Sequence, residues 1–426
     1  MRKLNLFFVV LFSLCVNSVT ARNFFCVTAE EDNVVIFWKN CDVQISFDGE
    51  NWEQKEKSDF VELAEAGDKV FFKGYNPGGI LQSETLDYSK SPRFQFSQSK
   101  KFSVSGNLMS LIYNDKNAAE EIPSDCFVLF FNKSAVTDAS KLELPVEYLS
   151  PGCYRAMFKE CIWLKKAPKL PAITLANNCY QEMFFGCTSL TKAPELPATT
   201  LADYCYSKMF MRTSIYETPI LPANTLKLNC YAAMFMECFN LTQTTPLPAL
   251  ELAKDCYAGM FAFCHNLEEA QDTLPAKIIK TSSYWGMFWN CKKLKKAPEL
   301  PATQLDYMCY EMMFAECPNL TEAPELPATI MAKRCYDHMF HACVSLTKAP
   351  ELPATILAER CYYNMFSNCT KLRKTSELRA KKLAQSCYEE MFMNCSRLKK
   401  KPKLPTENLE IRCYKNMFTG CDKLSE

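Results

Sequence analysis

Histidine and glycine are both scarce in this chain, which has three histidines and 11 glycines among 426 residues. Catalysis that depends on a histidine base has almost no residue to use. The sequence also has no G-x-S-x-G, no H-E-x-x-H and no glycine-rich phosphate loop. We therefore expect no enzyme, no catalytic residue and no cofactor. An exported hydrolase built on a pair of carboxylates stays open as a third alternative, because sequence alone does not reveal such a pair.

A net charge and a long apolar run are missing as well. Lys plus Arg (49) nearly equal Asp plus Glu (48), and we expect no nucleic-acid partner. No segment after residue 21 is long and apolar enough to cross a membrane. The charge is nevertheless uneven: residues 28–65 hold eleven acids against three bases, and residues 372–403 hold ten bases against three acids. Such asymmetry can attract a charged partner, although simple solvation also explains a run of charges.

The first 21 residues have the pattern of a secretory signal peptide. Arg2 and Lys3 precede an apolar run over residues 4–16, and a small-residue cleavage site ends at Ala21. A lipoprotein anchored at Cys15 is the less favoured alternative, because Leu14 is a poor fit to the small residue that lipoprotein processing requires. We expect a secreted or cell-surface protein cleaved after Ala21.

An internal repeat dominates the rest of the chain. CYQEMFFGC at Cys179 recurs as CYAAMFMEC at Cys230 and CYEMMFAEC at Cys309, and the copies that begin at residues 309, 335, 361, 387 and 413 are 26 residues apart. With degenerate copies, the first of them at Cys126, the pattern occurs about twelve times. A period of about 26 residues is typical of leucine-rich repeats and differs from that of ankyrin or tetratricopeptide arrays.

Each unit predicts a short helix followed by a short strand. Tyr180, Met183, Phe184 and Cys187 have the i, i+3, i+4, i+7 spacing of one helix face. The segment after them runs through Leu190 and Leu196 with prolines that remove ladder donors, which predicts a short and irregular strand. The expected fold class is an α/β repeat solenoid over residues 119–426, preceded by a small all-β sandwich.

The repeat resembles the BspA-type leucine-rich repeats of bacterial surface proteins, whose core reads M/A-F-x-x-C-x-x-L. Met183, Phe184, Cys187 and Leu190 match that core, and the resemblance covers about residues 119–426. It implies a cell-surface or secreted protein, and adhesion to host or matrix proteins is reported for some members. It transfers the fold and does not identify a ligand.

Residues 22–118 are predicted to form a β-sandwich-like head that caps the solenoid. Four segments are rich in β-branched and aromatic residues, and turn residues such as Asp48-Gly49 separate them. The predicted strands cover residues 34–38, 43–47, 70–73 and 94–104.

The 24 cysteines suggest a disulfide framework, but the repeat argues for free thiols. Helical positions eight apart lie too far from each other for a bridge, and Ser134, Thr213 and Ser283 replace cysteines as small buried residues would. Cys26 and Cys41 in the head form the expected bridge. No C-x-x-C cluster indicates zinc, and we interpret His338 and His341 as solvent-facing residues with no metal.

Repeated charges in the strand segments define the candidate binding face. Two slots three residues apart hold lysine or glutamate in successive units. In a stack they become parallel rows about 5 Å apart, which serve either for solubility or for binding. The face consists of Lys192, Glu195, Lys296, Glu299, Glu325, Lys348, Glu351, Lys374 and Glu377.

The leading hypothesis is therefore an adhesin-like module that binds an extracellular or host protein, with a matrix protein or a glycan among the partners. The alternative is a structural spacer or stalk that presents the N-terminal head. The sequence does not determine the oligomeric state.

Overall fold

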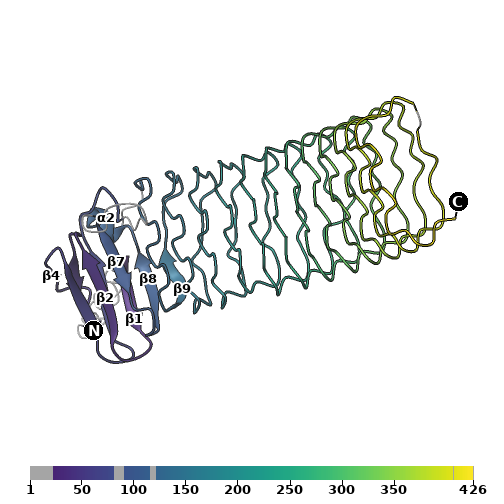
Figure 1. Cartoon of the computed structure of the whole chain (residues 1–426). Coiled ribbons are helices and arrows are strands. Elements are labelled where there is room, and N and C mark those ends of the chain that lie inside the picture. Colours follow the sequence, from purple (N-terminus) through teal and green to yellow (C-terminus); the bar gives the residue numbers. More distant parts are fainter. Residues whose placement is uncertain (1–22, 81–90, 116–120, 406, 426) are drawn as a thin grey trace, which may run out of the picture. The chain divides into compact units, whose positions relative to one another are not determined.

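The computed structural model describes residues 23–80, 91–115, 121–405 and 407–425. The expected signal peptide and Cys15 lie outside the described residues. The chain forms two compact units, one of residues 1–172 with 186–190 and one of residues 173–185 with 191–426 (Figure 1). No helix in the described part of the chain is long and apolar enough to span a membrane.

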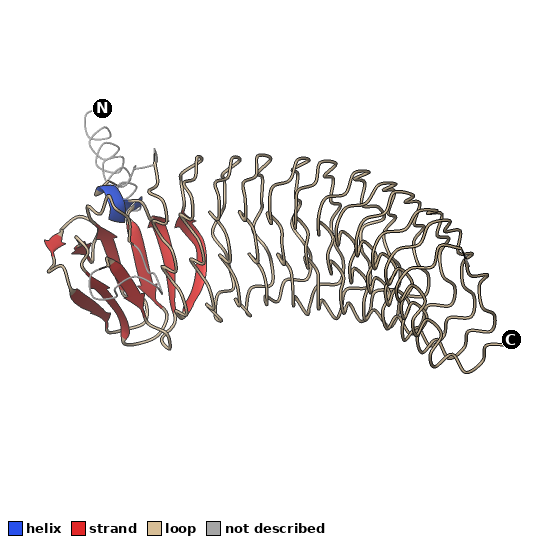
Figure 2. Ribbon diagram, turned by 45° about the horizontal axis from the view of Figure 1, so that its top comes forward, coloured by secondary structure: helices blue, strands red, loops and turns tan. Residues whose placement is uncertain are grey.

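The first unit contains two β-sheets, drawn in red in Figure 2. A six-stranded sheet has the order β4-β3-β6-β1-β8-β9, and a three-stranded sheet has the order β5-β2-β7. All pairs are antiparallel except β8 with β9. The strands are β1 Phe25–Ala29, β2 Val34–Lys39, β3 Gln44–Ser46, β4 Glu53–Gln54, β5 Asp59–Leu63, β6 Lys69–Lys73, β7 Arg93–Phe96, β8 Phe102–Asn107 and β9 Val136–Glu143, and the helix α2 is Ser110–Tyr113.

Aromatic side chains from the two sheets form the core of this unit. Trp38 of β2 lies 6.2 Å from Phe72 of β6, and Phe25 of β1 lies 6.4 Å from Phe96 of β7, between ring centroids. Phe130, in the first degenerate repeat, packs against Phe25 and Phe96 at 6.1 and 5.3 Å. The repeat that begins at Cys126 therefore closes the same core that the sheets form.

The strands predicted at residues 34–38, 43–47 and 70–73 coincide with β2, β3 and β6. The single strand predicted over residues 94–104 is wrong, because a turn separates β7 from β8. In that turn the Lys100 N–H donates to Ser97 Oγ at 3.0 Å. The prediction missed β1, β4, β5 and β9. The parallel strand β9 begins the side-by-side stacking of the repeats, which continues in the bridge between Asp138 and Lys166.

The short helix predicted in each repeat is also wrong. The only helix among the described residues is α2, and the Cys-Tyr-x-x-Met-Phe segments form consecutive turns. Within one segment the Met183 N–H donates to Tyr180 O at 3.2 Å, an i to i−3 bond, whereas the neighbouring Glu182 N–H donates to Ser207 O of the next repeat at 3.0 Å. Glu182 has a φ of +56°. An α-helix would bond i to i−4 throughout.

Left-handed residues recur at three fixed slots of the repeat. They stand one residue before the first cysteine slot, three after it and seven after it, as at Tyr204, Lys208 and Arg212 (φ +57°, +55° and +61°). The same three slots have a positive φ in every repeat, from the one that begins at Cys126 to the one that begins at Cys413. The side-chain pattern therefore repeats every four residues, and two adjacent positions in each group of four point inward.

Stacked columns of identical side chains fill the interior of the second unit, whose turns lie side by side in Figure 1. Tyr310 and Tyr336 stack with ring centroids 5.7 Å apart, and Phe288, Phe314 and Phe340 stack at 5.6 and 5.7 Å. All five rings are at most 1% exposed. Each ring is covered by the rings of the turns before and after it, so no turn buries its own core.

The cysteines form a column of buried free thiols, as predicted. All 23 cysteines of the described residues are unbridged. Cys317 Sγ donates to Phe288 O of the preceding turn at 3.1 Å, and Cys343 Sγ donates to Phe314 O at the same distance. The expected bridge between Cys26 and Cys41 is wrong, because both thiols are free and Cys41 Sγ donates to Lys39 O at 3.3 Å.

Replacing Phe314 by Ala tests the packing of the columns. We expect a loss of about 3–5 kcal/mol in the free energy of unfolding, because the ring is fully buried between two others. Ile330→Ala, at a position that is 57% exposed, should change it by less than about 0.5 kcal/mol. Urea unfolding followed by circular dichroism measures both. Equal effects of the two variants would contradict the assignment of buried and exposed faces.

Thiol labelling tests the cysteine column. Burial raises the pKa of Cys161 to about 12 and that of Cys335 to about 12, so the reactive thiolate is rare near neutral pH. We expect slow labelling of the native protein by a thiol reagent. Under denaturing, non-oxidising conditions, most of the 21 repeat cysteines (the 24 of the chain without Cys15, Cys26 and Cys41) should react. Bridged pairs found by mass spectrometry of that sample would contradict the free thiols.

Candidate functional site

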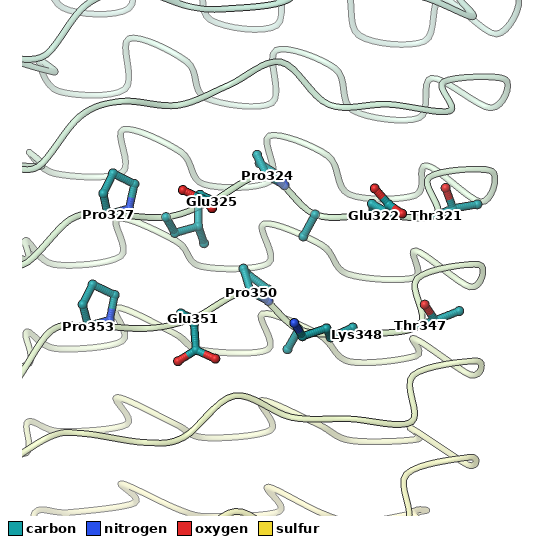
Figure 3. Close-up of a pocket in the computed structure, with 13 residues that line it drawn as sticks. Thr321, Glu322, Pro324, Glu325, Pro327, Thr347, Lys348, Pro350, Glu351 and Pro353 are labelled. Atoms are coloured by element: carbon teal, nitrogen blue, oxygen red, sulfur yellow. The ribbon is translucent and has the colours of Figure 1, made fainter.

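The strand sides of neighbouring turns enclose a groove between residues 321–327 and 347–353 (Figure 3). Its volume is about 650 Å³. Pro324 and Pro327 line one side and Pro350 and Pro353 the other, so the two rims repeat each other one turn apart. The groove is thus a property of the repeat.

Two further grooves have the same construction. One of about 530 Å³ lies between residues 191–197 and 216–222, and one of about 360 Å³ lies between residues 296–301 and 322–327. The first of these has apolar rims, with Tyr216 50% and Ile220 74% exposed. Adjacent grooves share the segment 322–327, so a ligand could extend across both.

Proline chemistry explains why the grooves form here. Pro324 and Pro350 have no N–H and cannot donate to a neighbouring strand. Within the described residues, no β-bridge or backbone hydrogen bond joins 321–327 to 347–353, whereas bridges recur where other residues occupy the ladder, as between Lys348 and Lys374. At the groove of residues 296–327 a bridge between Lys296 and Glu322 joins the two rims at one end, and the proline segments beyond it are left open.

The structure brings most residues of the predicted binding face to these grooves. Lys192 and Glu195 line the groove at 191–222, Glu299 and Glu325 lie on opposite rims of the groove at 296–327, and Glu325 and Glu351 lie on opposite rims of the groove at 321–353. Lys296 lines the groove at 296–327, and Lys348 lines the groove at 321–353. The grooves place these charges next to apolar proline rings.

Lys374 and Glu377 lie outside the three grooves. Lys374 is bridged through its backbone to Lys348, and Glu377 Oε2 accepts from Arg379 Nε at 3.2 Å. Within the described residues, no ion pair joins a lysine of the predicted face to a glutamate of it. The described ion pairs use other partners, such as Lys296 with Asp272 at 3.5 Å.

A row of exposed apolar residues was missed by sequence reasoning. Ile278, Ile330 and Ile356 are 60%, 57% and 61% exposed and occupy the slot five residues before the first cysteine position of their units. Bridges at this slot join neighbouring turns, as between Gln304 and Ile330. The β-branched residue directly after LPAT was the available signal.

Buried carboxylates on the turn side were missed as well. Glu311 and Asp337 occupy the slot two residues after the first cysteine and are 4% and 0% exposed. Arg334 Nη2 lies 2.7 Å from Glu311 Oε1, and Arg334 Nε lies 2.9 Å from Asp337 Oδ2. Arg360 Nε adds a contact of 3.3 Å to Asp337. The network crosses three turns.

His338 and His341, interpreted from the sequence as solvent-facing, are only partly exposed, and each contacts a neighbouring side chain. His338 Nδ1 contacts the carboxylate of Asp337, and His338 is only 28% exposed. His341 Nδ1 lies 2.8 Å from Asn364 Oδ1. In the described residues no group of three or more His, Cys, Asp or Glu side chains is arranged to hold a metal ion. The histidines belong to the charged network of the turn side.

The buried network shifts the titration of Glu311. Burial and, after it, the negative charge of Asp337 raise the pKa of Glu311 to about 7, although Arg334 opposes the shift. One carboxylate oxygen, Glu311 Oε2, has no hydrogen-bond partner. Because the folded pKa lies above the usual value of 4.5, the folded state binds this proton more tightly than the unfolded state.

Glu311→Gln should therefore flatten the pH dependence of stability. The wild-type contribution is fully present below the unfolded pKa of about 4.5 and is lost as pH rises through about 7. We expect the variant to gain up to about 3 kcal/mol relative to the wild type between pH 4.5 and 8, measured by urea unfolding. Glu316→Gln, at an exposed position of the same turn, is the control. Parallel pH curves for Glu311→Gln and the wild type would contradict the shift.

The geometry defines a class of protein: a coiled repeat with stacked leucine, aromatic and cysteine columns, and with grooves along its strand side. The chain belongs to the family described as the BspA type leucine rich repeat region, which matches residues 154–295, 231–373 and 287–426 in six copies. These segments cover more than half of the chain. The resemblance seen in the sequence is confirmed.

Among solved structures, the chain is similar to the crystal structure of a leucine rich cell surface protein from Faecalibacterium prausnitzii A2-165. It is 15% identical, has a TM-score of 0.29, and the match covers 71% of this chain and 88% of that chain. At this TM-score the likeness supports no inference about the present chain. No curated protein matches the chain.

Proposed function

We propose that the chain is a secreted or cell-surface protein that binds an extended segment of another protein in the strand-side grooves. The observation that carries the proposal is the groove between residues 321–327 and 347–353, in which Pro324 and Glu325 on one rim face Pro350 and Glu351 on the other across a volume of about 650 Å³. A peptide with basic residues between apolar ones fits such a lining.

Several features support an extended ligand. The grooves repeat from turn to turn and share a segment, so contact area grows with ligand length. In the described residues Glu325 makes no ion pair, and its carboxylate is free for a partner. A surface location agrees with the family and with the proposed signal peptide at 1–21. We retain residues 22–118 as the proposed β-sandwich head and 119–426 as the solenoid.

A second candidate rests on an aromatic patch in the first unit. Phe37 and Phe60 are 47% and 52% exposed, their ring centroids are 5.6 Å apart, and they line a hollow of about 480 Å³ with Lys39 and Arg93. Large exposed aromatic side chains in contact mark interaction sites. If this patch carries recognition, the repeats act as a spacer that holds it at a distance.

Charge reversal separates the two functions. In the full chain, Glu299→Lys, Glu325→Lys and Glu351→Lys together should weaken binding to an immobilised extracellular matrix protein at least tenfold, because they reverse three of the four carboxylates that line two adjoining grooves. Added salt should weaken wild-type binding too. Surface plasmon resonance measures both effects.

The control reverses three exposed acids outside the grooves, and it should change affinity less than about twofold. These acids are Glu62, Glu147 and Glu316. Loss of binding in the double variant Phe37→Ser and Phe60→Ser, with normal binding by the groove variant, would favour the spacer and reject the groove.

A further inference from the structure

Basic residues gather on the strand side of the last turns of the second unit. All of them are exposed, and one acidic residue, Glu377, lies among them. The other two acids of this region, Glu389 and Glu390, lie on the turn side and are engaged there. Glu389 accepts from Arg412 Nε at 3.0 Å, and Glu390 accepts from Asn364 Nδ2 at 2.9 Å. The basic patch consists of Arg373, Lys374, Arg379, Lys381, Lys382, Lys399, Lys400, Lys401 and Lys403.

The charges of the patch are mostly uncompensated. Arg379 pairs with Glu351 and Glu377 at 3.4 and 3.2 Å, and within the described residues the other eight side chains make no ion pair. Backbone bridging joins Lys348 to Lys374, which places two lysines of one slot on neighbouring strands about 4.8 Å apart. Like charges this close destabilise the fold.

The fold does not require these bases. Lys401 stands in the slot that Ala349 holds two turns earlier, and Lys403 stands in the slot of Glu351. Ala349 is 1% exposed where it contributes to the coil, whereas Lys401 is exposed. In the last turns, lysines therefore replace residues that fit the same backbone in earlier turns, and these lysines repel one another. An external anion removes that cost.

We propose that the basic patch binds a linear anionic polysaccharide. The extended segment from Arg373 to Lys382 spans up to about 30 Å, at about 3.3 Å per residue, so several anionic groups of one polymer can meet it. Seven of the nine residues of the basic patch are lysines. A lysine is a flexible point charge and does not demand the bidentate geometry that arginine gives with phosphate. The patch therefore suits sulfate or carboxylate groups spread along a chain.

Nucleic acid and lipid fit the patch less well. Among the described residues, no large exposed hydrophobic side chain lies between Ile356 and Leu409, so the patch offers no aromatic platform for bases and no apolar anchor for a bilayer. The patch also has no helix to enter a DNA groove. The patch adjoins the groove at 321–353 through the ion pair of Arg379 with Glu351, but none of its residues lines that groove and its proposed ligand does not depend on the function proposed there.

The test uses the full chain with dextran sulfate and polygalacturonate as probes, which present sulfate and carboxylate groups. We expect binding at physiological salt that weakens steeply as salt rises. The lysines neutralise anionic groups of the polysaccharide, and this releases the counterions bound to those groups. Lys399→Gln, Lys400→Gln, Lys401→Gln and Lys403→Gln together should weaken it at least tenfold. Biolayer interferometry over a salt series measures this, and thermal melting checks that each variant folds.

The matched control removes the same amount of charge elsewhere in the second unit, and it should lower affinity less than about twofold. It changes four exposed lysines that make no described ion pair to Gln: Lys227, Lys277, Lys280 and Lys292. Equal losses in both variants would show that only net charge matters and would overturn the proposal. Tighter binding to a single-stranded oligonucleotide or to anionic vesicles, or no binding to either polysaccharide, would overturn it too.

Discussion

The coil depends on hydrogen bonds between successive turns, and those bonds depend on left-handed residues. At Glu182 the positive φ lets an N–H that would otherwise bond within its own turn reach Ser207 O of the next turn. The left-handed conformation costs roughly 1–2 kcal/mol at a residue other than glycine. Only a neighbouring turn that accepts the bond and covers the aromatic rings offsets this cost. The tyrosine, phenylalanine and cysteine columns follow, because turns bonded in one register place identical residues above one another.

The sequence predicted the repeat, its length and its buried residues correctly, but it predicted the wrong local structure. Tyr180, Met183, Phe184 and Cys187 fit a helix period of about 3.6 residues, and they fit a period of four equally well. Cys179 distinguishes the two, because Cys179, Met183 and Cys187 are spaced by four and all three are fully buried. The free thiols were predicted partly on helix geometry that does not exist. The structural reason is different: the slot is narrow, and its thiol donates to a carbonyl of the preceding turn, as Cys317 does to Phe288.

The candidate site was predictable as a set of slots and not as a shape. Rows of lysine and glutamate follow directly from the 26-residue spacing. The grooves beside them arise because Pro324 and Pro350 leave two neighbouring segments without hydrogen bonds, and no single turn reveals how far such segments separate. The slot of Glu311 and Asp337 holds different residues in different copies, so the repeat pattern does not mark these two carboxylates as buried. In the structure, arginines from the left-handed slot one residue before the first cysteine, Arg334 and Arg360, cover these carboxylates.

The turn side and the strand side have different roles, and this explains how one coil can carry surfaces of different chemistry. The turn side supplies the bonds and the buried columns, and its register is fixed by the left-handed slots. The strand side contributes inward residues such as Leu326 and Leu352, which are 3% and 2% exposed, while the residues between them face outward. The outward slot of Glu325 and Glu351 can therefore change to lysine at position 403 with no change in the inward pattern. Because each repeat contacts mainly the repeats before and after it, a change of sign costs repulsion or gains attraction locally and leaves the distant turns unaffected. An acidic, proline-lined surface and a basic one can thus occupy successive parts of the same strand side.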